Sequence, residues 1–319
     1  MPLPEKALID RIRRKARTNR ALVASIGDDC AVLRLPRGHD TLVTTDFSLE
    51  EMHFRREWHP PEVVGHRCLT RGLSDIAAMG GEPVAAFLSL ALPRDLPQKW
   101  VGRFLTGLLA LADQFKVPLA GGDTAQSPNG ILADILVLGS VPRGKAILRS
   151  GARPGDRIYI TGELGEAAAA LDLMFSGRKL RPEDYPRHFH PLPRITLGRY
   201  LRQKNLASAM IDISDGLSTD LKHICEESSV GAEIRDYAIP RARMGKTGHK
   251  LELKYALHGG DEYELIFTAR PERKVPSKIA GVAITEIGRI TRGREMISIN
   301  ASGKRSRLRA EGWQHFASR

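Results

Sequence analysis

The sequence predicts a two-domain protein that mixes helices and strands, an α/β (α+β) chain. With 319 residues, of which 42% are hydrophobic, the chain is long enough to build two hydrophobic cores. Short β-branched runs alternate with segments of helical periodicity in both halves. A turn-rich joint, Ser-Gly-Ala-Arg-Pro-Gly-Asp at residues 150–156, separates the halves. We therefore expect one domain over residues 1–148 and a second over residues 149–319.

The first half is expected to contain helices and strands in alternation. Leu8, Ile12 and Ala16 recur at helical spacing, and Pro61 and Gly80 are placed to begin and end a longer helix. Apolar runs bounded by turn residues indicate the strands. The expected helices are residues 5–17, 61–79 and 98–115, and the expected strands are residues 30–35, 41–46, 84–92 and 131–141.

The second half alternates strands and helices around one long loop. Gly162 and Gly165 form a tight turn before a helix, and residues 176–194, rich in Pro, Arg and His, are expected to be irregular. Each half carries a Gly-Gly-Asp, a weak hint of two related α/β units. The expected helices are residues 166–175, 195–203 and one that starts at 217; the expected strands are residues 157–161, 209–213, one after Gly260 and those within 283–299.

The stretch Ile211–Leu221 is where the candidate chemistry concentrates. A short apolar strand ends at two carboxylates, Asp212 and Asp215, and after Gly216 apolar residues return at helical spacing. Ligands of α/β sheets gather outside the carboxyl ends of the strands, which is where these acids stand. Taken alone, the pattern also fits an ordinary helix N-cap followed by a solvated acid.

Acids recur at strand ends and on one apolar helix face along the chain. Asp75 shares a helical stripe with Val64 and Cys68, where a carboxylate needs a cation or hydrogen bonds, although a surface acid is the alternative. Magnesium prefers oxygen ligands and binds through carboxylates together with substrate phosphates. The pattern therefore predicts magnesium-dependent phosphate chemistry. The acids concerned are Asp28, Asp46, Asp75, Asp123, Asp212 and Asp215.

Composition argues against several other classes of protein. The formal net charge is +12, but no helix-turn-helix, zinc-finger or RNA-binding aromatic motif accompanies it, so no specific nucleic-acid partner is expected. No run approaches the roughly 18 apolar residues of a membrane span. Cys30, Cys68 and Cys225 are few and far apart, which favours reduced thiols in a cytoplasmic protein over a zinc site or a disulfide framework.

Familiar phosphate-binding and nucleophile motifs are missing. Residues 244–247 (Met-Gly-Lys-Thr) look like the end of a Walker loop, but Pro240 stands where that loop requires glycine. Residues 66–68 (His-Arg-Cys) lack the Asp of a protein-kinase catalytic loop, and no Gly-x-Ser-x-Gly occurs. Metals and glycine turns are therefore expected to hold any nucleotide.

A set of short motifs follows one order along nearly the whole chain. They are Ile26–Asp29, Thr44–Asp46 with Glu50 and His53-Phe54, Leu73–Gly80, Gly121–Thr124, Arg149–Ala152, Thr161-Gly162 with Leu164-Gly165, Asp212–Leu217, Tyr263–Leu265 and Gly312-Trp313. In this order and spacing the chain resembles the thiamine-monophosphate kinases, a family of the aminoimidazole ribonucleotide synthetase-like superfamily.

The resemblance implies a two-domain fold in which the N-terminal domains pair into a homodimer and bind metal and ATP, and the C-terminal domain completes the site. It implies transfer of the γ-phosphoryl group of ATP to thiamine monophosphate, assisted by several Mg²⁺ ions. The implied magnesium ligands are Asp28, Thr44, Thr45, Asp46, Asp75, Asp123, Asp212 and Asp215. The implied ATP contacts are Gly122, Asp123, Arg149 and Ser214, and the implied substrate contacts are His53, Asp261, Glu262 and Trp313.

Elementary chemistry agrees with this reaction. A phosphate monoester has a second pKa of about 6, so the attacking oxygen is largely anionic at neutral pH and no catalytic general base is expected. Metals that neutralise two polyanions would supply most of the catalysis. The positive thiazolium ring suits an acid and an indole face, here Asp261 or Glu262 and Trp313.

One departure from the family keeps other readings open. Members usually carry Gly-Gly-Glu-Asp where this chain reads Gly-Gly-Asp-Glu at residues 259–262, so either acid can be the one that faces the substrate. The alternatives are a sister ATP-using enzyme with a different acceptor, as in aminoimidazole ribonucleotide synthetase, and an inactive scaffold. A basic nucleic-acid-binding protein is a rival from another class.

Overall fold

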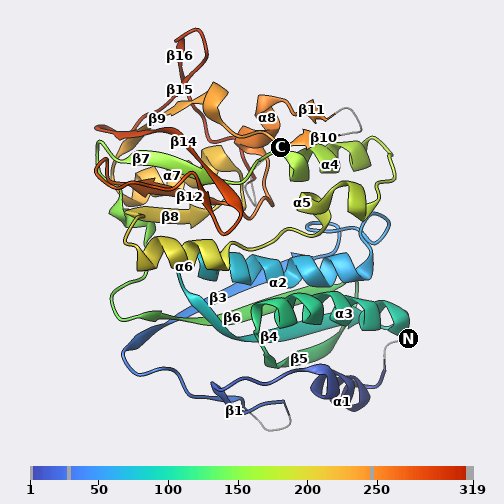
Figure 1. The fold of residues 1–319 in the computed structure, drawn as a ribbon. Coiled ribbons are helices and arrows are strands. Elements are labelled where there is room, and N and C mark those ends of the chain that lie inside the picture. Colours follow the sequence, from blue (N-terminus) through green and yellow to red (C-terminus); the bar gives the residue numbers. More distant parts are fainter. Residues whose placement is uncertain (1–2, 27–29, 245–247, 314–319) are drawn as a thin grey trace. The chain divides into compact units, whose positions relative to one another are not determined.

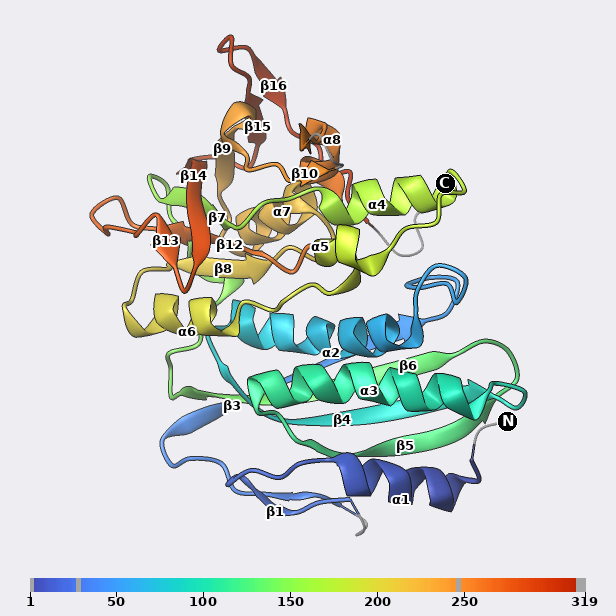
Figure 2. The same cartoon turned by 45° about the vertical axis from the view of Figure 1, so that its right-hand side comes forward.

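The computed structural model describes residues 3–26, 30–244 and 248–313 (Figure 1). The chain divides into two compact units. The first comprises Met1–Ile76 and Gly81–Gly144, and the second comprises Ala77–Gly80 and Lys145–Arg319. Both units combine a sheet with helices, which confirms the predicted α/β class (Figures 1 and 2).

The sheet of the first unit has four strands in the order β3-β6-β4-β5. Strand β6 is antiparallel to both β3 and β4, whereas β4 and β5 are parallel and are joined through helix α3 (Gln98–Phe115). The strands are β3 (His39–Leu49), β4 (Glu82–Pro93), β5 (Leu119–Ser127) and β6 (Leu132–Pro142). The predicted strands 41–46, 84–92 and 131–141 are therefore confirmed, with β3 longer than expected.

Helices α2 (Pro61–Ala78) and α3 run side by side over one face of this sheet (Figures 1 and 2). They approach each other closely at two glycines. A Cβ on Gly65 would lie 2.0 Å from the carbonyl oxygen of Phe104, and one on Gly107 would lie 1.9 Å from that of Glu62. The glycines therefore bring the two helix backbones together, and the sheet face below them is buried.

The N-terminal residues form helix α1 (Glu5–Lys15) and a two-stranded antiparallel ribbon. The ribbon consists of β1 (Leu22–Ala24) and β2 (Val32–Leu33), and its apolar side chains pack against Val84, Ala85 and Ala120. The predicted helix 5–17 is confirmed, and the predicted strand 30–35 is present in the shorter form of β2.

The second unit is built on a larger sheet in the order β16-β15-β9-β14-β7-β12-β8, with β13 beside β14. Its central strands β7 and β12 contribute the fully buried Ile158, Ile160 and Ile266 to the core. The strands are β7 (Arg157–Thr161), β8 (Ala209–Asp212), β9 (Gly231–Arg235), β12 (Leu265–Ala269), β13 (Lys278–Ile279), β14 (Val282–Thr291), β15 (Met296–Ile299) and β16 (Arg305–Arg307). A separate ribbon pairs β10 (Arg243–Met244) with β11 (His249–Lys250).

Helices of the second unit agree with most of the predicted ranges. They are α4 (Glu166–Phe175), α5 (Pro186–Phe189), α6 (Ile195–Gln203), α7 (Leu217–Glu227) and α8 (Leu253–His258), with 3-10 turns at Arg149–Gly151, Pro182–Asp184 and Asp236–Ala238. The region 176–194 is less irregular than expected, because it contains α5 and one of these turns. Buried His188 and Phe189 anchor it, and His188 Nδ1 lies 3.1 Å from the carbonyl oxygen of Ala167.

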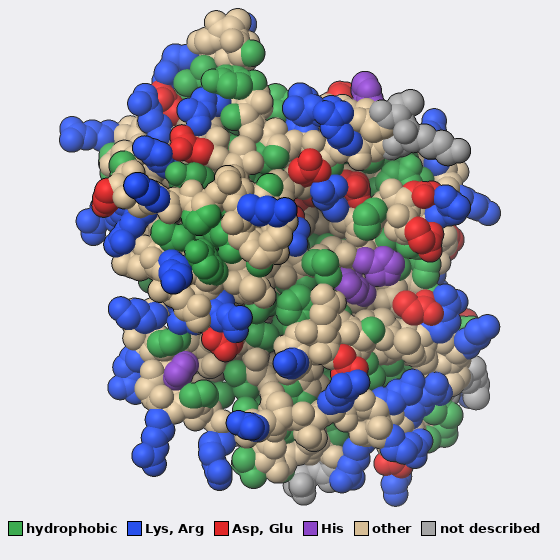
Figure 3. All heavy atoms as spheres, in the orientation of Figure 1, with side chains coloured by type: hydrophobic (Ala, Val, Ile, Leu, Met, Phe, Trp, Pro, Cys, Tyr) green, Lys and Arg blue, Asp and Glu red, His purple; other side chains and the backbone are tan. Residues whose placement is uncertain are grey.

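Two structural observations concern the nucleic-acid-binding proteins and membrane proteins that composition argued against. In the face drawn in Figure 3, Lys and Arg side chains are scattered, with Asp and Glu between them, and do not form one continuous basic stripe. Within the described residues, every helix is too short or too polar to cross a membrane.

Candidate active site

Two carboxylates of the first unit, Asp46 and Asp75, lie close together, and a third, Asp134, is nearby on the opposite face of the sheet. Asp46 is on β3, Asp75 on the facing helix α2, and Asp134 on the neighbouring strand β6. The Thr44 hydroxyl donates a hydrogen bond to Asp75 Oδ2, and the Thr45 hydroxyl donates to Asp134 Oδ1 at 2.5 Å. Successive residues of a strand point to opposite faces, so β3 supplies hydroxyl groups on both sides of the sheet.

The negative charges of these carboxylates repel one another. The pKa of Asp46 is raised to about 7, mainly by burial and also by the negative charges of Asp75 and Asp134, whereas Arg71 opposes the shift. A bound divalent cation would remove the repulsion, and carboxylates with hydroxyl groups are the hard oxygen donors that magnesium prefers. The donor set therefore fits magnesium.

Asp123 lies on β5, two strands away from Asp134 in the same row of the sheet. Asp134 is opposite Ser89 on β4, and Ser89 is opposite Asp123. Two strand spacings amount to roughly 10 Å, too far for one ion to bind both carboxylates. Gly122 has φ 143°, and a Cβ there would lie 1.8 Å from the Leu88 carbonyl oxygen, so this position requires glycine. The structure thus groups Thr44, Asp46 and Asp75 on one face of the sheet, places Thr45 with Asp134 on the other face, and separates Asp123 from both groups.

His53 stands in the loop after β3 with its ring orientation fixed. Its Nδ1 accepts a hydrogen bond of 3.0 Å from the backbone N–H of Leu49. Glu50 Oε2 accepts from the N–H of Ile131 at 2.9 Å and ties the same loop to the residue before β6. Substrate contact by His53 stays a prediction.

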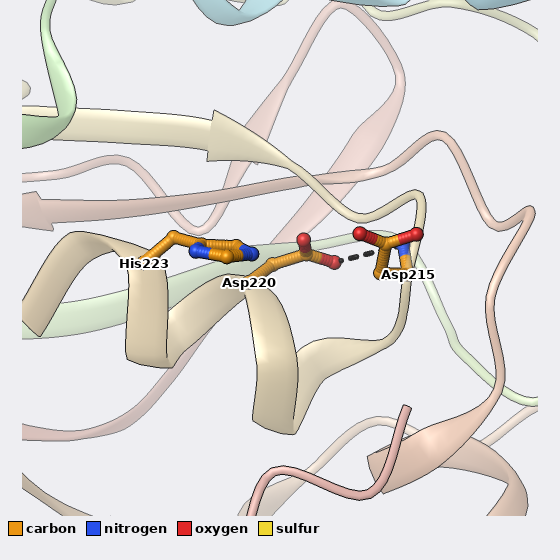
Figure 4. Close-up of side chains that lie close together, drawn as sticks. All are labelled: Asp215, Asp220 and His223. Carbon is orange, nitrogen blue, oxygen red and sulfur yellow. Dashed lines mark hydrogen bonds between the residues drawn. The ribbon is translucent and has the colours of Figure 1, made fainter. Parts of the chain in front are cut away.

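In the second unit, the strand β8 ends at Asp212 as predicted, and α7 begins after a turn of four residues. Gly216 has φ 116°, and a Cβ there would lie 2.8 Å from the carbonyl group of His258, so glycine is required. The Asp220 carboxylate reaches back from the first turn of α7 and accepts hydrogen bonds from the N–H groups of Asp215 (3.2 Å; Figure 4) and Gly216 (3.0 Å). This buried acid holds the turn in shape.

Asp215, Asp220 and His223 form a second group of potential ligands that sequence reasoning only partly identified. Their nearest ligand atoms lie within 4.8 Å of one another, with Asp220 and His223 projecting from α7 towards Asp215 (Figure 4). Burial raises the pKa of Asp220 well above its ordinary value, and repulsion from Asp212 and Asp215 adds to the shift. The signal available in the sequence was an acid in the first turn of a helix that follows Gly216.

Two segments distant in sequence meet at the turn Ile213–Gly216. The N–H of Asp261 donates to the carbonyl oxygen of Ser214 at 2.8 Å, and the N–H of Trp313 donates to that of Asp215 at 3.0 Å. Four predicted site residues of this unit, Ser214, Asp215, Asp261 and Trp313, are therefore neighbours along the backbone hydrogen-bond network.

The two exchanged acids have different surroundings. Glu262 is only 5% exposed, and its Oε1 accepts a 2.8 Å hydrogen bond from the N–H of Gly165 at the start of α4. Burial raises the pKa of Glu262 to about 8, and its Oε2 has no hydrogen-bond partner among the described residues. Asp261 is half-buried, has φ 61° and accepts a 2.5 Å hydrogen bond from the Tyr263 hydroxyl. Asp261 is thus the more accessible acid.

Arg149 lies at the opposite end of α7 from Asp215. The Ser228 hydroxyl, just beyond the last residue of α7, donates to the carbonyl oxygen of Arg149 at 2.7 Å. The 11-residue helix spans roughly 16 Å. Contact of Arg149 with ATP stays a prediction. Asp28 lies outside the described residues, as do residues 245–247 of the Walker-like segment.

Comparisons with known proteins agree with this arrangement. Residues 27–141 match the family model of the AIR synthase related protein, N-terminal domain, and residues 153–299 match that of the C-terminal domain. The chain is 36% identical to the thiamine-monophosphate kinase of Salmonella typhimurium over 329 aligned positions, which cover 99% of both proteins.

Solved structures give the same result. The thiamine-monophosphate kinase of Stenotrophomonas maltophilia K279a has a TM-score of 0.82 at 36% identity and covers 93% of this chain and 97% of its own. AaThiL complexed with AMPPCP and TMP has a TM-score of 0.77 at 32% identity and covers 98% of this chain and 97% of its own. With near-complete coverage at this identity, the chain belongs to the thiamine-monophosphate kinase family.

Proposed function

We propose that the chain transfers the γ-phosphoryl group of ATP directly, in line, to the phosphate of thiamine monophosphate and so forms thiamine diphosphate. The observation that carries this proposal is the near-full-length similarity to thiamine-monophosphate kinases, including AaThiL complexed with AMPPCP and TMP. The exchanged acids at 261–262 are compatible with it, because the buried Glu262 stabilises the α4 N-terminus and the N–H of the more accessible Asp261 is hydrogen-bonded to Ser214, the residue before Asp215.

Magnesium ions are proposed as the reaction's cofactor. The clustered carboxylates and threonine hydroxyl groups described above support this. When bound, the ions would neutralise the phosphate oxygens of two polyanions that must meet. The proposed ligands are Asp28, Thr44, Thr45, Asp46, Asp75, Asp123, Asp212 and Asp215, and we add Asp134 because it accepts a hydrogen bond from the Thr45 hydroxyl.

The chain's own residues would orient the two substrates. Gly122 and Ser214 present backbone close to the proposed metal ligands Asp123 and Asp215, which suits contact with ATP phosphates, and Arg149 is retained as a further proposed ATP contact. His53, Asp261, Glu262 and Trp313 are the proposed contacts of thiamine monophosphate. A carboxylate and an indole face both favour a cationic thiazolium ring. We assign the direct contact to Asp261 and a supporting role to the buried Glu262.

No residue is proposed as a general base. At neutral pH the acceptor phosphate, with a second pKa of about 6, already presents an anionic oxygen. The chain's task is to align donor and acceptor and to exclude unproductive orientations, which is the larger part of catalysis in phosphoryl transfer.

A homodimer in the cytoplasm is the proposed form of the enzyme. Val43 and Phe47 on β3 leave 63% and 55% of their surface exposed on the sheet face opposite α2 and α3. Exposed apolar side chains on a regular sheet face suit burial against a second copy. All three cysteines are free, which agrees with a reducing compartment.

Phosphorus NMR of a reaction with ATP, magnesium and thiamine monophosphate tests the proposal. We expect a β-phosphate signal of thiamine diphosphate from the wild-type protein and none from Asp46→Asn. Asp134→Asn tests the added ligand, with a raised magnesium requirement expected. ADP and free phosphate without thiamine diphosphate would instead indicate another acceptor and refute the proposed substrate.

A further inference from the structure

The segment Glu311–Trp313 lies on the N-terminal turn of α7. The N–H of Gly312 donates to the Thr219 hydroxyl oxygen at 3.1 Å, and the N–H of Trp313 donates to the carbonyl oxygen of Asp215 at 3.0 Å. These two successive bonds align the chain just before the indole. Thr219 is only 2% exposed, so its hydroxyl is held in a fixed position.

Gly312 makes this approach possible. A Cβ on residue 312 would lie 2.1 Å from the Asp215 carbonyl oxygen and 2.6 Å from the Thr219 hydroxyl oxygen. Both distances are far inside van der Waals contact, so a larger residue would displace the segment. The need for glycine here is one of space, because its φ lies outside the left-handed region.

A weaker contact flanks these bonds. The Ser218 hydroxyl lies 2.9 Å from His258 Nδ1, and the N–H of Glu311 donates to the same hydroxyl at 3.4 Å. His258 Nε2 lies 3.9 Å from the Glu311 carboxylate. The first turn of α7 therefore holds the segment at two consecutive hydroxyl side chains.

We propose that Thr219 is a positioning residue that, with Gly312, sets the place of Trp313 relative to Asp215 and thereby the affinity for the thiazolium substrate. The inference rests on the proposed function, in which Trp313 contacts thiamine monophosphate. Trp313 is 43% exposed, so burial restrains it less than a core tryptophan. The carbonyl oxygen of Asp215 accepts the hydrogen bond from the Trp313 N–H, and the N–H of Asp215 donates to the Asp220 carboxylate. One rigid turn therefore supports both a proposed metal ligand and the tryptophan.

Thr219→Val tests the role of the hydroxyl alone. Valine has nearly the same shape and helix propensity as threonine but cannot accept the Gly312 N–H. Loss of one such hydrogen bond corresponds to roughly a two- to tenfold change in an equilibrium. We expect KM for thiamine monophosphate to rise by about that factor, with KM for ATP within twofold of the wild type. Thr219→Ser, which keeps the hydroxyl, should restore KM.

Gly312→Ala and a matched control complete the set. The alanine should displace the segment and raise KM for thiamine monophosphate by about tenfold or more. Thr268→Val removes another buried hydroxyl of the second unit, one that contacts the Ser208 hydroxyl at 2.7 Å on β12. It should lower the melting temperature without separating the two KM values.

Hydrogen exchange of the peptide that contains residues 311–313 provides a readout independent of catalysis. Faster exchange in Thr219→Val than in Thr268→Val is expected. Unchanged exchange, or an unchanged KM for thiamine monophosphate with loss of stability alone, would overturn the positioning role. A wild-type protein that makes no thiamine diphosphate would refute the proposed function and the substrate part of this inference, whereas exchange would still decide whether Thr219 holds the segment.

Discussion

At the scale of single residues, Asp46 shows how burial prepares a carboxylate for a cation. Its pKa of about 7 arises from burial and from its neighbours Asp75 and Asp134. Because the folded-state pKa is raised above the ordinary value of an aspartate, the stability linked to this group is present below that ordinary value. It is lost as pH rises through about 7. Without metal, the folded protein therefore carries an electrostatic penalty at alkaline pH.

We predict that magnesium stabilises the protein more at pH 8 than at pH 6, because protons compete with the ion for Asp46 below pH 7. The measurement is the melting temperature with magnesium and with a chelator at each pH. Asp46→Asn should be more stable than the wild type at pH 8 in chelator, by on the order of 1–2 kcal/mol, and should gain much less from magnesium. Equal magnesium effects at both pH values would contradict the prediction.

At the scale of elements, the α2–α3 pair depends on glycines that propensity disfavours. Alanine at residue 107 would favour the helix by about 1 kcal/mol, but its Cβ would lie 1.9 Å from the Glu62 carbonyl oxygen. We predict that Gly107→Ala lowers the free energy of unfolding by about 1–3 kcal/mol, as overpacking does. Ala110→Gly, at an exposed position of the same helix, is the control and should cost about 1 kcal/mol through propensity alone. A more stable Gly107→Ala protein would show that the helices can move apart freely.

The open face of β3 is the second element-scale feature. We predict that Phe47→Asp, which places a charge on the exposed apolar face, converts the proposed dimer into monomers in sedimentation velocity experiments. Phe175→Asp is the matched control, since Phe175 is similarly exposed, at 61%, but lies at the end of α4 in the second unit. A dimer that survives Phe47→Asp, or a monomeric wild type, would refute the proposed interface.

At the scale of the whole molecule, periodicity determined most elements. The helices α3, α4 and α6 have the predicted bounds, because each is a long or strongly patterned segment with clear ends. Strands β9 and β16 were not predicted. Gly-Ala-Glu-Ile-Arg and Arg-Ser-Arg lack an apolar run, and their pairing partners on β14 and β15 decide their conformation.

Some candidate site residues could be identified from local sequence patterns, whereas others depend on long-range strand pairing. Asp212 stands at the end of β8, as the local strand and turn pattern predicted, whereas Asp46, predicted to end its strand, lies inside β3, which continues to Leu49. Asp134 was missed, although a lone acid inside an apolar strand was a usable signal. Its relevance depends on β6 lying next to β3, a long-range pairing that local patterns do not contain.

The sequence by itself determined the fold class and the family, and it supplied the acids that we propose as metal ligands, because these follow from local periodicity and from motifs in a fixed order. Tertiary structure alone decided which residues contact one another and which stay accessible. It directed Glu262 to the N-terminus of α4, left Asp261 accessible, and brought Gly312 onto Thr219 over a separation of 93 residues. The physical reason is that hydrogen bonding and burial depend on which distant segments pack together, and a local pattern carries no information about them.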